Sequence, residues 1–301
     1  MEFVNPQYLV DVAWLAENLY DPGVRVVDVT SRLTSDLKNM AKEKCFDLGH
    51  IPGSVHLDVG SGHGALSDPD HALSWMWPSD AQIEAVLGEL GVTNGTRVIL
   101  VARTPREGLD SGTMWCTRAW WTLHHSGVDC AILLGGIEAW EAAGQEMSTD
   151  QPSITPTRFT VPADAPSVTA RVNAEQVLAA LGEGATCVVD ALPTGRFDGT
   201  DPGYGPRRGH ITGAINLPYP RMITAETAAF ASPDVLAGIL AEAGLMAKDR
   251  VITYCGGAIA ATVDAFVLKL FGHPNVAVYD GSLMEWSARP ELPMTNPSGQ
   301  D

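Results

Sequence analysis

The chain is poor in cysteine and in positive charge, and both shortages limit what it can do. Its 301 residues include five cysteines, which form neither a CxxC nor a CxxH pair. Neither a structural zinc site nor a disulfide framework is therefore indicated, and the odd, scattered count fits a reducing compartment. Only 19 lysines and arginines stand against 36 aspartates and glutamates, giving a formal net charge of −17. This charge argues against nucleic acid or an anionic membrane as a partner of the whole surface.

Long hydrophobic runs are also absent. No uninterrupted apolar stretch approaches the roughly 20 residues that a membrane helix needs, and Met1–Pro6 lacks the basic and apolar regions of a signal peptide. We therefore expect a soluble, cytoplasmic protein without a membrane partner. The hydrophobic content of 45% is that of a globular protein. The length suffices for two domains of ordinary size, roughly 100–150 residues each.

The chain contains an internal repeat. The motif GHIPGSVHL at Gly49–Leu57 returns as GHITGAINL at Gly209–Leu217. A short β-rich run ending in aspartate precedes each copy, and a helical segment followed by an apolar strand comes after it. The flanking runs are Val24–Asp28 and Arg97–Val101 in the first copy, and Cys187–Asp190 and Arg250–Tyr254 in the second. We interpret the two aspartates at the strand ends as structural anchors.

Each copy is predicted to fold as a small α/β domain. Short apolar strands that alternate with helix-length segments are typical of parallel βαβ units, and so of a doubly wound parallel sheet flanked by helices. We expect an N-terminal domain over residues 1–146 and a C-terminal domain over residues 168–301. The intervening residues 147–167 hold four prolines, and proline at this density is typical of an extended linker.

One cysteine stands where a strand gives way to a run of small residues. Val251–Tyr254 suits a buried strand, Gly256 and Gly257 allow a tight turn, and Ala258–Phe271 has the apolar spacing of a helix. On that turn Cys255 would lie over a nest of backbone N–H groups at the positive end of a helix dipole. Both features favour thiolate over thiol. An activated sulfur nucleophile is the leading interpretation, and a buried, inert cysteine is the alternative.

The first copy lacks this nucleophile. Aligning the two repeats places Ala102 opposite Cys255, and the loop after Ala102 has no glycine–alanine run. Cys116, Cys130 and Cys187 lie on a predicted helix or beside apolar strands, and we interpret them as packing residues. Ligands of open parallel sheets bind beyond the carboxyl ends of strands, which is where Cys255 stands.

These motifs resemble the tandem-domain rhodaneses, a family of sulfurtransferases. The resemblance covers nearly the whole chain and rests on several motifs in the right order: GHIPG and GHITGAINLP, Asp190 with GRFDG, YCGG at residues 254–257, and VYDGS with the following EW. It implies two rhodanese-like domains, of which the second carries the nucleophile. The active-site loop, which would also bind substrate, would then be Cys255, Gly256, Gly257, Ala258, Ile259 and Ala260.

The family's chemistry would make this chain a sulfurtransferase. The Cys255 thiolate would take sulfane sulfur from thiosulfate or 3-mercaptopyruvate as a persulfide, and cyanide, a small thiol or a protein thiol would then accept it. Loop N–H groups would stabilise charge on sulfur in both steps. The implied partners are a small anionic donor and a thiol or cyanide acceptor, with neither a metal nor an organic cofactor.

Further site residues follow from the resemblance. Arg196 matches the arginine of the family's Gly-Arg-[Phe/Tyr] motif, and its guanidinium would bind the anionic group of the donor. Arg207 and Arg208 are weaker candidates for the same task. His50 would contact substrate or assist proton transfer, with Asp36 as its partner. The alternative for His50 is a structural hydrogen bond to a nearby loop.

The loop departs from both donor types of the family. It lacks the basic residues that follow the cysteine in thiosulfate-type enzymes, and Gly257 and Ala260 replace the serine and threonine of the mercaptopyruvate-type sequence Cys-Gly-Ser-Gly-Val-Thr. The preferred donor therefore stays open, and modest turnover is expected with either. A non-catalytic rhodanese module that binds proteins or relays sulfur between them is the main alternative. A Cys-X5-Arg phosphatase is disfavoured because Ala261 stands where its arginine would be.

Overall fold

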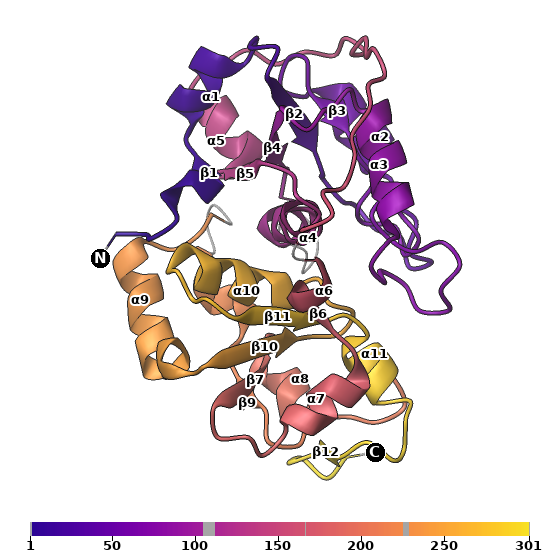
Figure 1. Cartoon of the computed structure of the whole chain (residues 1–301), viewed down its shortest axis with the longest axis vertical. Coiled ribbons are helices and arrows are strands. Elements are labelled where there is room, and N and C mark those ends of the chain that lie inside the picture. Colours follow the sequence, from indigo (N-terminus) through magenta and orange to yellow (C-terminus); the bar gives the residue numbers. More distant parts are fainter. Residues whose placement is uncertain (1, 105–111, 166, 225–228, 301) are drawn as a thin grey trace. The chain divides into compact units, whose positions relative to one another are not determined.

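The protein folds into two compact units. The structure is a computed structural model that describes residues 2–104, 112–165, 167–224 and 229–300. One unit, called the first unit here, holds Gln7–Ser167. The other, the second unit, holds most of the chain from Val168 onward together with the residues up to Pro6 (Figure 1).

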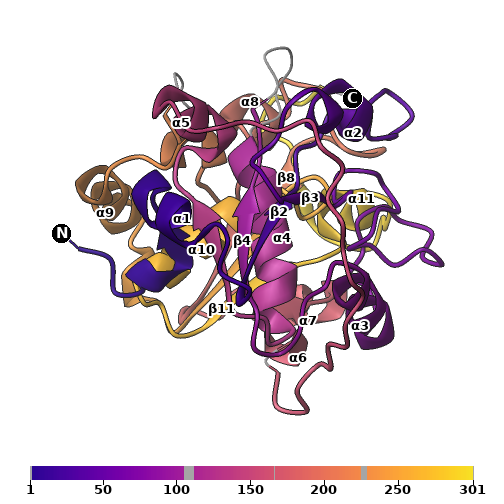
Figure 2. The same cartoon turned by 90° about the horizontal axis from the view of Figure 1, so that it is seen from above.

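The first unit is a parallel five-stranded sheet flanked by helices, with strand order β1-β5-β4-β2-β3. The strands are β1 (Leu9–Val10), β2 (Val24–Asp28), β3 (Val55–His56), β4 (Arg97–Val101) and β5 (Cys130–Leu133). The helices are η1 (Pro6–Tyr8), α1 (Val12–Asn18), α2 (Ala41–Lys44), η2 (Phe46–Leu48), α3 (Asp80–Glu89), α4 (Gly112–His125) and α5 (Gly136–Ala142), where η marks a 3-10 helix. The central strands are continuous apolar runs, so both faces of the sheet need a cover. Helix α4 supplies one such cover alongside β4 and β5 (Figure 2).

The second unit repeats this architecture, with strand order β6-β11-β10-β7-β9 and a separate two-stranded sheet of β8 and β12. The strands are β6 (Arg171–Val172), β7 (Thr186–Asp190), β8 (His210–Ile211), β9 (Ile215–Asn216), β10 (Arg250–Tyr254), β11 (Val276–Tyr279) and β12 (Met294–Thr295). The helices are α6 (Ser167–Ala170), α7 (Ala174–Ala180), α8 (Thr194–Phe197), η3 (Tyr219–Met222), α9 (Pro233–Glu242), η4 (Leu245–Ala247), α10 (Ala261–Leu270) and α11 (Ser282–Trp286). The predicted pair of doubly wound α/β folds is thus confirmed. Within the described ranges, no helix has the length and apolar character that a membrane crossing requires.

The strand register confirms the alignment of the two repeats. Asp28 pairs with Val101 in the first unit, and Asp190 pairs with Tyr254 in the second. Ala102 and Cys255 each follow the paired residue directly. They therefore occupy equivalent places, directly after the carboxyl end of β4 in the first unit and of β10 in the second.

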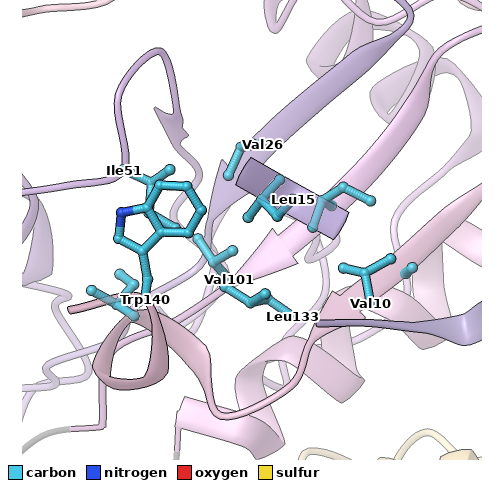
Figure 3. Close-up of a cluster of buried hydrophobic side chains, with 10 residues drawn as sticks. Val10, Leu15, Val26, Ile51, Val101, Leu133 and Trp140 are labelled. Atoms are coloured by element: carbon cyan, nitrogen blue, oxygen red, sulfur yellow. The ribbon is translucent and has the colours of Figure 1, made fainter. Parts of the chain in front are cut away.

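One hydrophobic cluster of the first unit lies between its sheet and the short helices α1 and α5. Alternate residues of a strand point to one face, and Ile99 and Val101 of β4 join Leu15 of α1 and Trp140 of α5 in one buried cluster (Figure 3). Asp11 positions α1 by accepting the N–H of Trp14 over 2.7 Å, an N-cap that ends the preceding strand. The N-cap and the burial of one helix face thus both stabilise α1, which explains why so short a helix forms.

The expected linker runs as an irregular segment along the first unit. Residues 149–162 have no regular secondary structure. Thr157 donates its N–H to the Gly88 carbonyl over 2.9 Å, Val161 donates its N–H to the Glu84 carboxylate over 2.9 Å, and Phe159 is buried. The proline-rich segment is therefore anchored by contacts at several points. The domain boundaries drawn around it stay a prediction.

The start of the chain packs with the second unit, although the sequence had placed it in the N-terminal domain. The N–H groups of Val4 and Asn5 both donate to the Leu270 carbonyl, over 2.9 and 3.0 Å. The Asn5 side chain donates to the Lys269 carbonyl over 2.8 Å. These contacts satisfy carbonyl groups at the C-terminal end of α10, which no intrahelical partner can reach.

Candidate active site

Cys255 lies at the carboxyl end of β10, in the centre of the second unit's sheet. The helix after it begins at Ala261, so the predicted helix start at Ala258 was wrong. Ala258 has φ 59°, a left-handed conformation that an α-helix does not contain. Residues 255–260 therefore form a loop at the head of α10, which runs alongside β10 and β11 (Figure 1).

The loop directs three backbone N–H groups at the Cys255 sulfur. They belong to Ala261, Gly257 and Ile259. Of the five loop residues predicted to form the cradle, two supply donors, and Ala261 beyond the predicted loop supplies the third. A ring of donors around one sulfur is the arrangement that stabilises an anion there.

Burial opposes these donors. Cys255 is 2% exposed, and this burial raises the pKa of the thiol above its ordinary value, although the N–H groups lower it. The charge of Asp190 acts in the same direction as burial. The expectation of a resting thiolate was therefore wrong. Withdrawal from water disfavours the anion by more than the donors recover, so the sulfur rests as a thiol at neutral pH.

Ser282, at the start of α11, supports the loop through hydrogen bonds. This residue was not identified from the sequence. Its hydroxyl accepts the N–H of Cys255 over 3.2 Å and the N–H of Ala258 over 3.1 Å, and it donates to the Tyr279 carbonyl over 2.8 Å. Ser282 is completely buried and has φ 48°. A left-handed serine is uncommon. The VYDGS motif was the available signal, but only the fold shows what its serine holds.

Arg196 stands on α8 and is connected to the loop through Tyr204, whose ring lies against Gly256. Its guanidinium carbon lies 5.4 Å from the centre of the Tyr204 ring. Neither Asp198 nor Asp201 forms an ion pair with it among the described residues. An ion pair with a neighbouring aspartate is thus not observed, and the charge of Arg196 is available to a ligand.

The two weaker arginine candidates have other partners. The Arg207 guanidinium donates to the carbonyl groups of Trp286, Ser287, Arg289 and Leu292, over 2.6 to 2.8 Å. It therefore caps the C-terminal end of α11, where a cation is favoured. Arg208 donates to the side chain of Gln300 over 3.3 Å. These bonds use four of the five N–H donors of the Arg207 guanidinium, so the main task of this side chain is structural.

The histidines of the two GHI motifs have equivalent structural contacts. His50 stacks on Phe46 with ring centroids 4.0 Å apart, and its Nδ1 lies 2.9 Å from the Phe46 carbonyl. His210 stacks on Phe197 at 3.6 Å, with its Nδ1 2.8 Å from the Phe197 carbonyl. The structural hydrogen bond expected as the alternative for His50 is therefore present. Its Nε2 has no hydrogen-bond partner among the described residues, and the predicted partner Asp36 instead accepts the Thr34 hydroxyl.

Two buried carboxyl groups lie near the loop. Asp190 accepts the N–H of Leu192 over 2.9 Å, as a structural anchor should, and burial raises its pKa to about 7. Asp264 of α10 was not singled out from the sequence. Both of its oxygens are buried without a hydrogen-bond partner in the described parts of the chain, and burial raises its pKa well above the ordinary value. The Asp264 carboxyl therefore holds its proton more tightly than a carboxyl in water does.

The first unit has a different kind of site at the corresponding sheet edge. A cavity of about 650 Å³ lies there, lined by Cys45, Arg103 and Glu141 among others. Arg103 is paired with Glu141 through two hydrogen bonds of 2.9 and 2.8 Å. Cys116 and Cys130 are buried, whereas Cys45 and Cys187 are partly exposed, and all five cysteines are free. No group of three or more metal-ligating side chains gathers within the described ranges.

Comparison with known proteins matches both halves of the chain to one family. The model of the rhodanese-like domain matches residues 11–143 and again residues 173–289. The chain is 31% identical over 294 residues to 3-mercaptopyruvate sulfurtransferase of Escherichia coli strain K12, covering 95% of this chain and 97% of that protein. It is 29% identical over 288 residues to thiosulfate sulfurtransferase of Gallus gallus, covering 93% of each.

A solved structure supports the same assignment. The crystal structure of SseA from Escherichia coli, described as a 3-mercaptopyruvate sulfotransferase with the rhodanese fold, superposes with a TM-score of 0.75 at 29% identity. The superposition covers 91% of this chain and 98% of that one. The duplicated sheets, the cysteine at a strand end and the sequence matches thus all indicate the rhodanese family.

Proposed function

The chain belongs to the rhodanese family, and from this premise we propose that it is a sulfurtransferase with Cys255 as its nucleophile. One observation carries the assignment: Cys255 ends the central strand of the second domain, with three backbone N–H groups directed at its sulfur. The first domain has Ala102 at the same place, so sulfur transfer rests on one site.

The donor step balances from a resting thiol. With 3-mercaptopyruvate, a bond forms between the Cys255 sulfur and the donor sulfur while the donor's C–S bond breaks. The thiol proton of Cys255 ends on the departing carbon, and pyruvate leaves. With thiosulfate the S–S bond breaks, sulfite leaves, and the proton moves to the outer sulfur. Both routes yield the Cys255 persulfide without an external oxidant or reductant.

The acceptor step regenerates the thiol. A thiol or cyanide attacks the outer sulfur, the S–S bond of the persulfide breaks, and the Cys255 sulfur regains a proton. The N–H groups of Gly257, Ile259 and Ala261 stabilise the charge that develops on sulfur in both steps. Because the ground-state thiol is favoured by burial, these donors act mainly on the transition state.

Arg196 binds the anionic end of the donor in this proposal. Its guanidinium is free of carboxylates among the described residues, and a planar guanidinium grips a carboxylate or sulfonate through two hydrogen bonds. In a chain with a net charge of −17, such a fixed cation is needed next to the sulfur. Arg196→Ala should therefore raise KM by more than it lowers kcat.

Sulfur relay between proteins is the second candidate. The absence of side-chain donors in the loop favours it, since it makes attack on a small donor slow. A partner protein that carries a persulfide would then replace thiosulfate or 3-mercaptopyruvate as the donor.

The mass of the intact protein tests the proposal. Incubation with each small donor should add one sulfur atom to the protein, and Cys255→Ser should abolish the gain. Cys45→Ser is the matched control, because Cys45 is a partly exposed thiol in the other unit and its loss should leave the gain intact. A sulfur atom retained by Cys255→Ser would refute the assignment, and charging by a protein persulfide alone would favour the relay.

His50 belongs to the proposal only as an assistant in proton transfer. If it moves a proton to the departing carbon, His50→Asn lowers kcat with 3-mercaptopyruvate and leaves thiosulfate turnover unchanged. Equal kcat values for the variant and the parent would leave His50 with its structural contact to Phe46 alone.

A further inference from the structure

The ring of Tyr204 lies directly on the backbone of the active-site loop. A β-carbon added to Gly256 would fall within contact distance of three ring atoms of Tyr204, 2.6 Å from its Cγ. Gly256 does not adopt a positive φ. The absence of a side chain at this position is therefore explained by the aromatic ring above it, since no backbone conformation here requires glycine.

The segment that carries Tyr204 is fastened to α11. Gly205 lies against the side chain of Ser287, and the Arg207 guanidinium holds the carbonyl groups at the end of the helix. The other end of α11 carries Ser282, which holds the Cys255 loop. One short helix thus positions both the loop and the ring that covers it.

The positively charged group of the site packs on the same ring. The guanidinium of Arg196 lies 5.4 Å from the ring centroid, within the range of a cation–π contact. Tyr204 remains 44% exposed despite its contacts with Gly256 and Arg196. A ligand that approaches the loop along this side therefore meets an aromatic surface and a guanidinium together.

Of the three arginines that are candidates for donor binding, Arg196 is the one whose side chain is without a hydrogen-bond partner among the described residues. The loop residues Gly256–Ala260 have no charged side chain, and Arg207 uses four of its five N–H groups on carbonyl groups. One guanidinium neutralises one carboxylate. A dianion such as thiosulfate would need a second cation besides Arg196, because an unpaired charge is costly in a site withdrawn from water.

We propose that Tyr204 is a specificity-determining residue that selects organic, carboxylate-bearing sulfur donors with a planar carbonyl group over inorganic thiosulfate. The carboxylate binds Arg196, and the flat carbonyl carbon skeleton lies on the exposed part of the Tyr204 ring. Tyr204 also occupies the space into which a side chain at position 256 would extend, so a basic residue there, as in the thiosulfate-type loop, is sterically excluded. The inference rests on the proposed function and names the donor class of the same site.

Variants at Tyr204 test the role of the ring. Tyr204→Leu should raise KM for 3-mercaptopyruvate on the order of tenfold, the factor expected for one lost aromatic contact, and should leave KM for thiosulfate nearly unchanged. Tyr204→Phe keeps the ring and should stay within about threefold of the parent. Tyr20→Leu is the matched control, since Tyr20 is 78% exposed in the first unit and should alter neither constant.

A second pair of variants tests the steric contact independently. Gly256→Ala places a methyl group against the ring. If the transition state bears a cost of the size found for overpacked cores, kcat/KM for 3-mercaptopyruvate should fall on the order of 10- to 100-fold. Removing the ring in Gly256→Ala/Tyr204→Ala should restore a large part of the loss that Gly256→Ala causes relative to the parent. Thermal unfolding of each variant separates a loss of fold from a loss of fit.

The outcomes distinguish this inference from the proposed function. Failure of the parent protein to gain sulfur from either donor contradicts the function itself. A parent that is charged by both donors, with Tyr204→Leu changing both KM values equally or neither, contradicts the role of Tyr204 alone. An additive double variant, with no restoration, shows that the ring does not limit position 256 and overturns the steric part.

Discussion

At the scale of the residue, the environment of Cys255 is a balance between burial and backbone donors. Three N–H groups lower the pKa of the thiol, and burial together with the charge of Asp190 raises it. Burial prevails, so the donors serve the charge that appears during reaction. Asp190 and Asp264 follow the same rule, because both carboxyl groups are withdrawn from water and hold their protons more tightly than in the unfolded chain.

The titration of Asp190 should appear in the stability of the protein. Its pKa is raised from 3.8 to about 7, so between these pH values the unfolded chain loses the proton before the folded protein does. The free energy of unfolding should therefore fall as pH rises from about 4 to 7, by up to about 4 kcal/mol from this group.

Urea unfolding at pH 5 and pH 8 measures this effect. Asp190→Asn keeps the oxygen that accepts the N–H of Leu192 but cannot ionise. The fall in the free energy of unfolding from pH 5 to pH 8 should therefore be smaller in the variant than in the parent by a few kcal/mol. The fall that remains in the variant includes the contribution of Asp264. The same decline in both proteins would show that Asp190 is ionised throughout.

At the scale of the element, α11 acts as a bracket for the active-site loop. Its first residue, Ser282, accepts two loop N–H groups, and the N–H groups of Leu283 and Met284 donate to the carbonyls of Cys255 and Gly256 over 3.0 and 2.9 Å. In the first unit, the N–H of Ile137 in α5 donates to the Ala102 carbonyl over 3.1 Å. The unit without the cysteine thus has one hydrogen bond equivalent to those that α11 makes with the active-site loop.

Ser282→Ala should loosen the loop without changing its backbone preference. Alanine tolerates φ 48° no better than serine, so the change isolates the hydroxyl group. Two buried N–H groups would lose their acceptor, and we expect a loss of about 2–3 kcal/mol in unfolding free energy together with slower charging of Cys255 by the donor.

The control for this change is Ser287, the C-cap residue of the same helix. Ser287 is buried, and its hydroxyl has no hydrogen-bond partner in the described structure. Ser287→Ala should therefore leave stability within about 0.5 kcal/mol of the parent. Equal losses from the two serines would mean that the Ser282 hydroxyl contributes nothing specific to the loop.

At the scale of the whole molecule, the net charge of −17 opposes the arrival of any anionic donor. Arg196 attracts the donor only over a short distance, whereas the surplus of carboxylates repels it over a range that salt controls. The Debye length falls from about 30 Å at 0.01 M salt to about 8 Å at 0.15 M. Screening therefore weakens the distant repulsion more than the contact with Arg196.

The salt dependence of turnover should reveal this balance. Screening changes most between about 0.01 and 0.15 M salt. Raising the sodium chloride concentration over this range should increase kcat/KM for an anionic donor. Alkylation of Cys255 by neutral iodoacetamide should not change over the same range. A steady fall of kcat/KM from the lowest salt onward would mean that local attraction dominates and that the net charge is irrelevant to donor binding.

The sequence by itself determined the duplicated fold, the place of Cys255 at a strand end and the lack of a nucleophile at Ala102. These features depend on hydrophobic periodicity and on repeated motifs, which are local and can be read along the chain. It was also sufficient to single out Arg196, although the assignment of its role remains a proposal. The helix start was missed by three residues because nothing local shows that Ala258 is left-handed.

Only the tertiary structure decided which residues position the active-site loop and in which direction the pKa values of its ionisable groups shift. Ser282, Tyr204 and Asp264 act through contacts with segments that lie far from them in sequence. The direction of the Cys255 pKa depends on how much water the folded chain removes from the sulfur. Burial and contact between distant segments are created by folding, so no pattern along the chain records them.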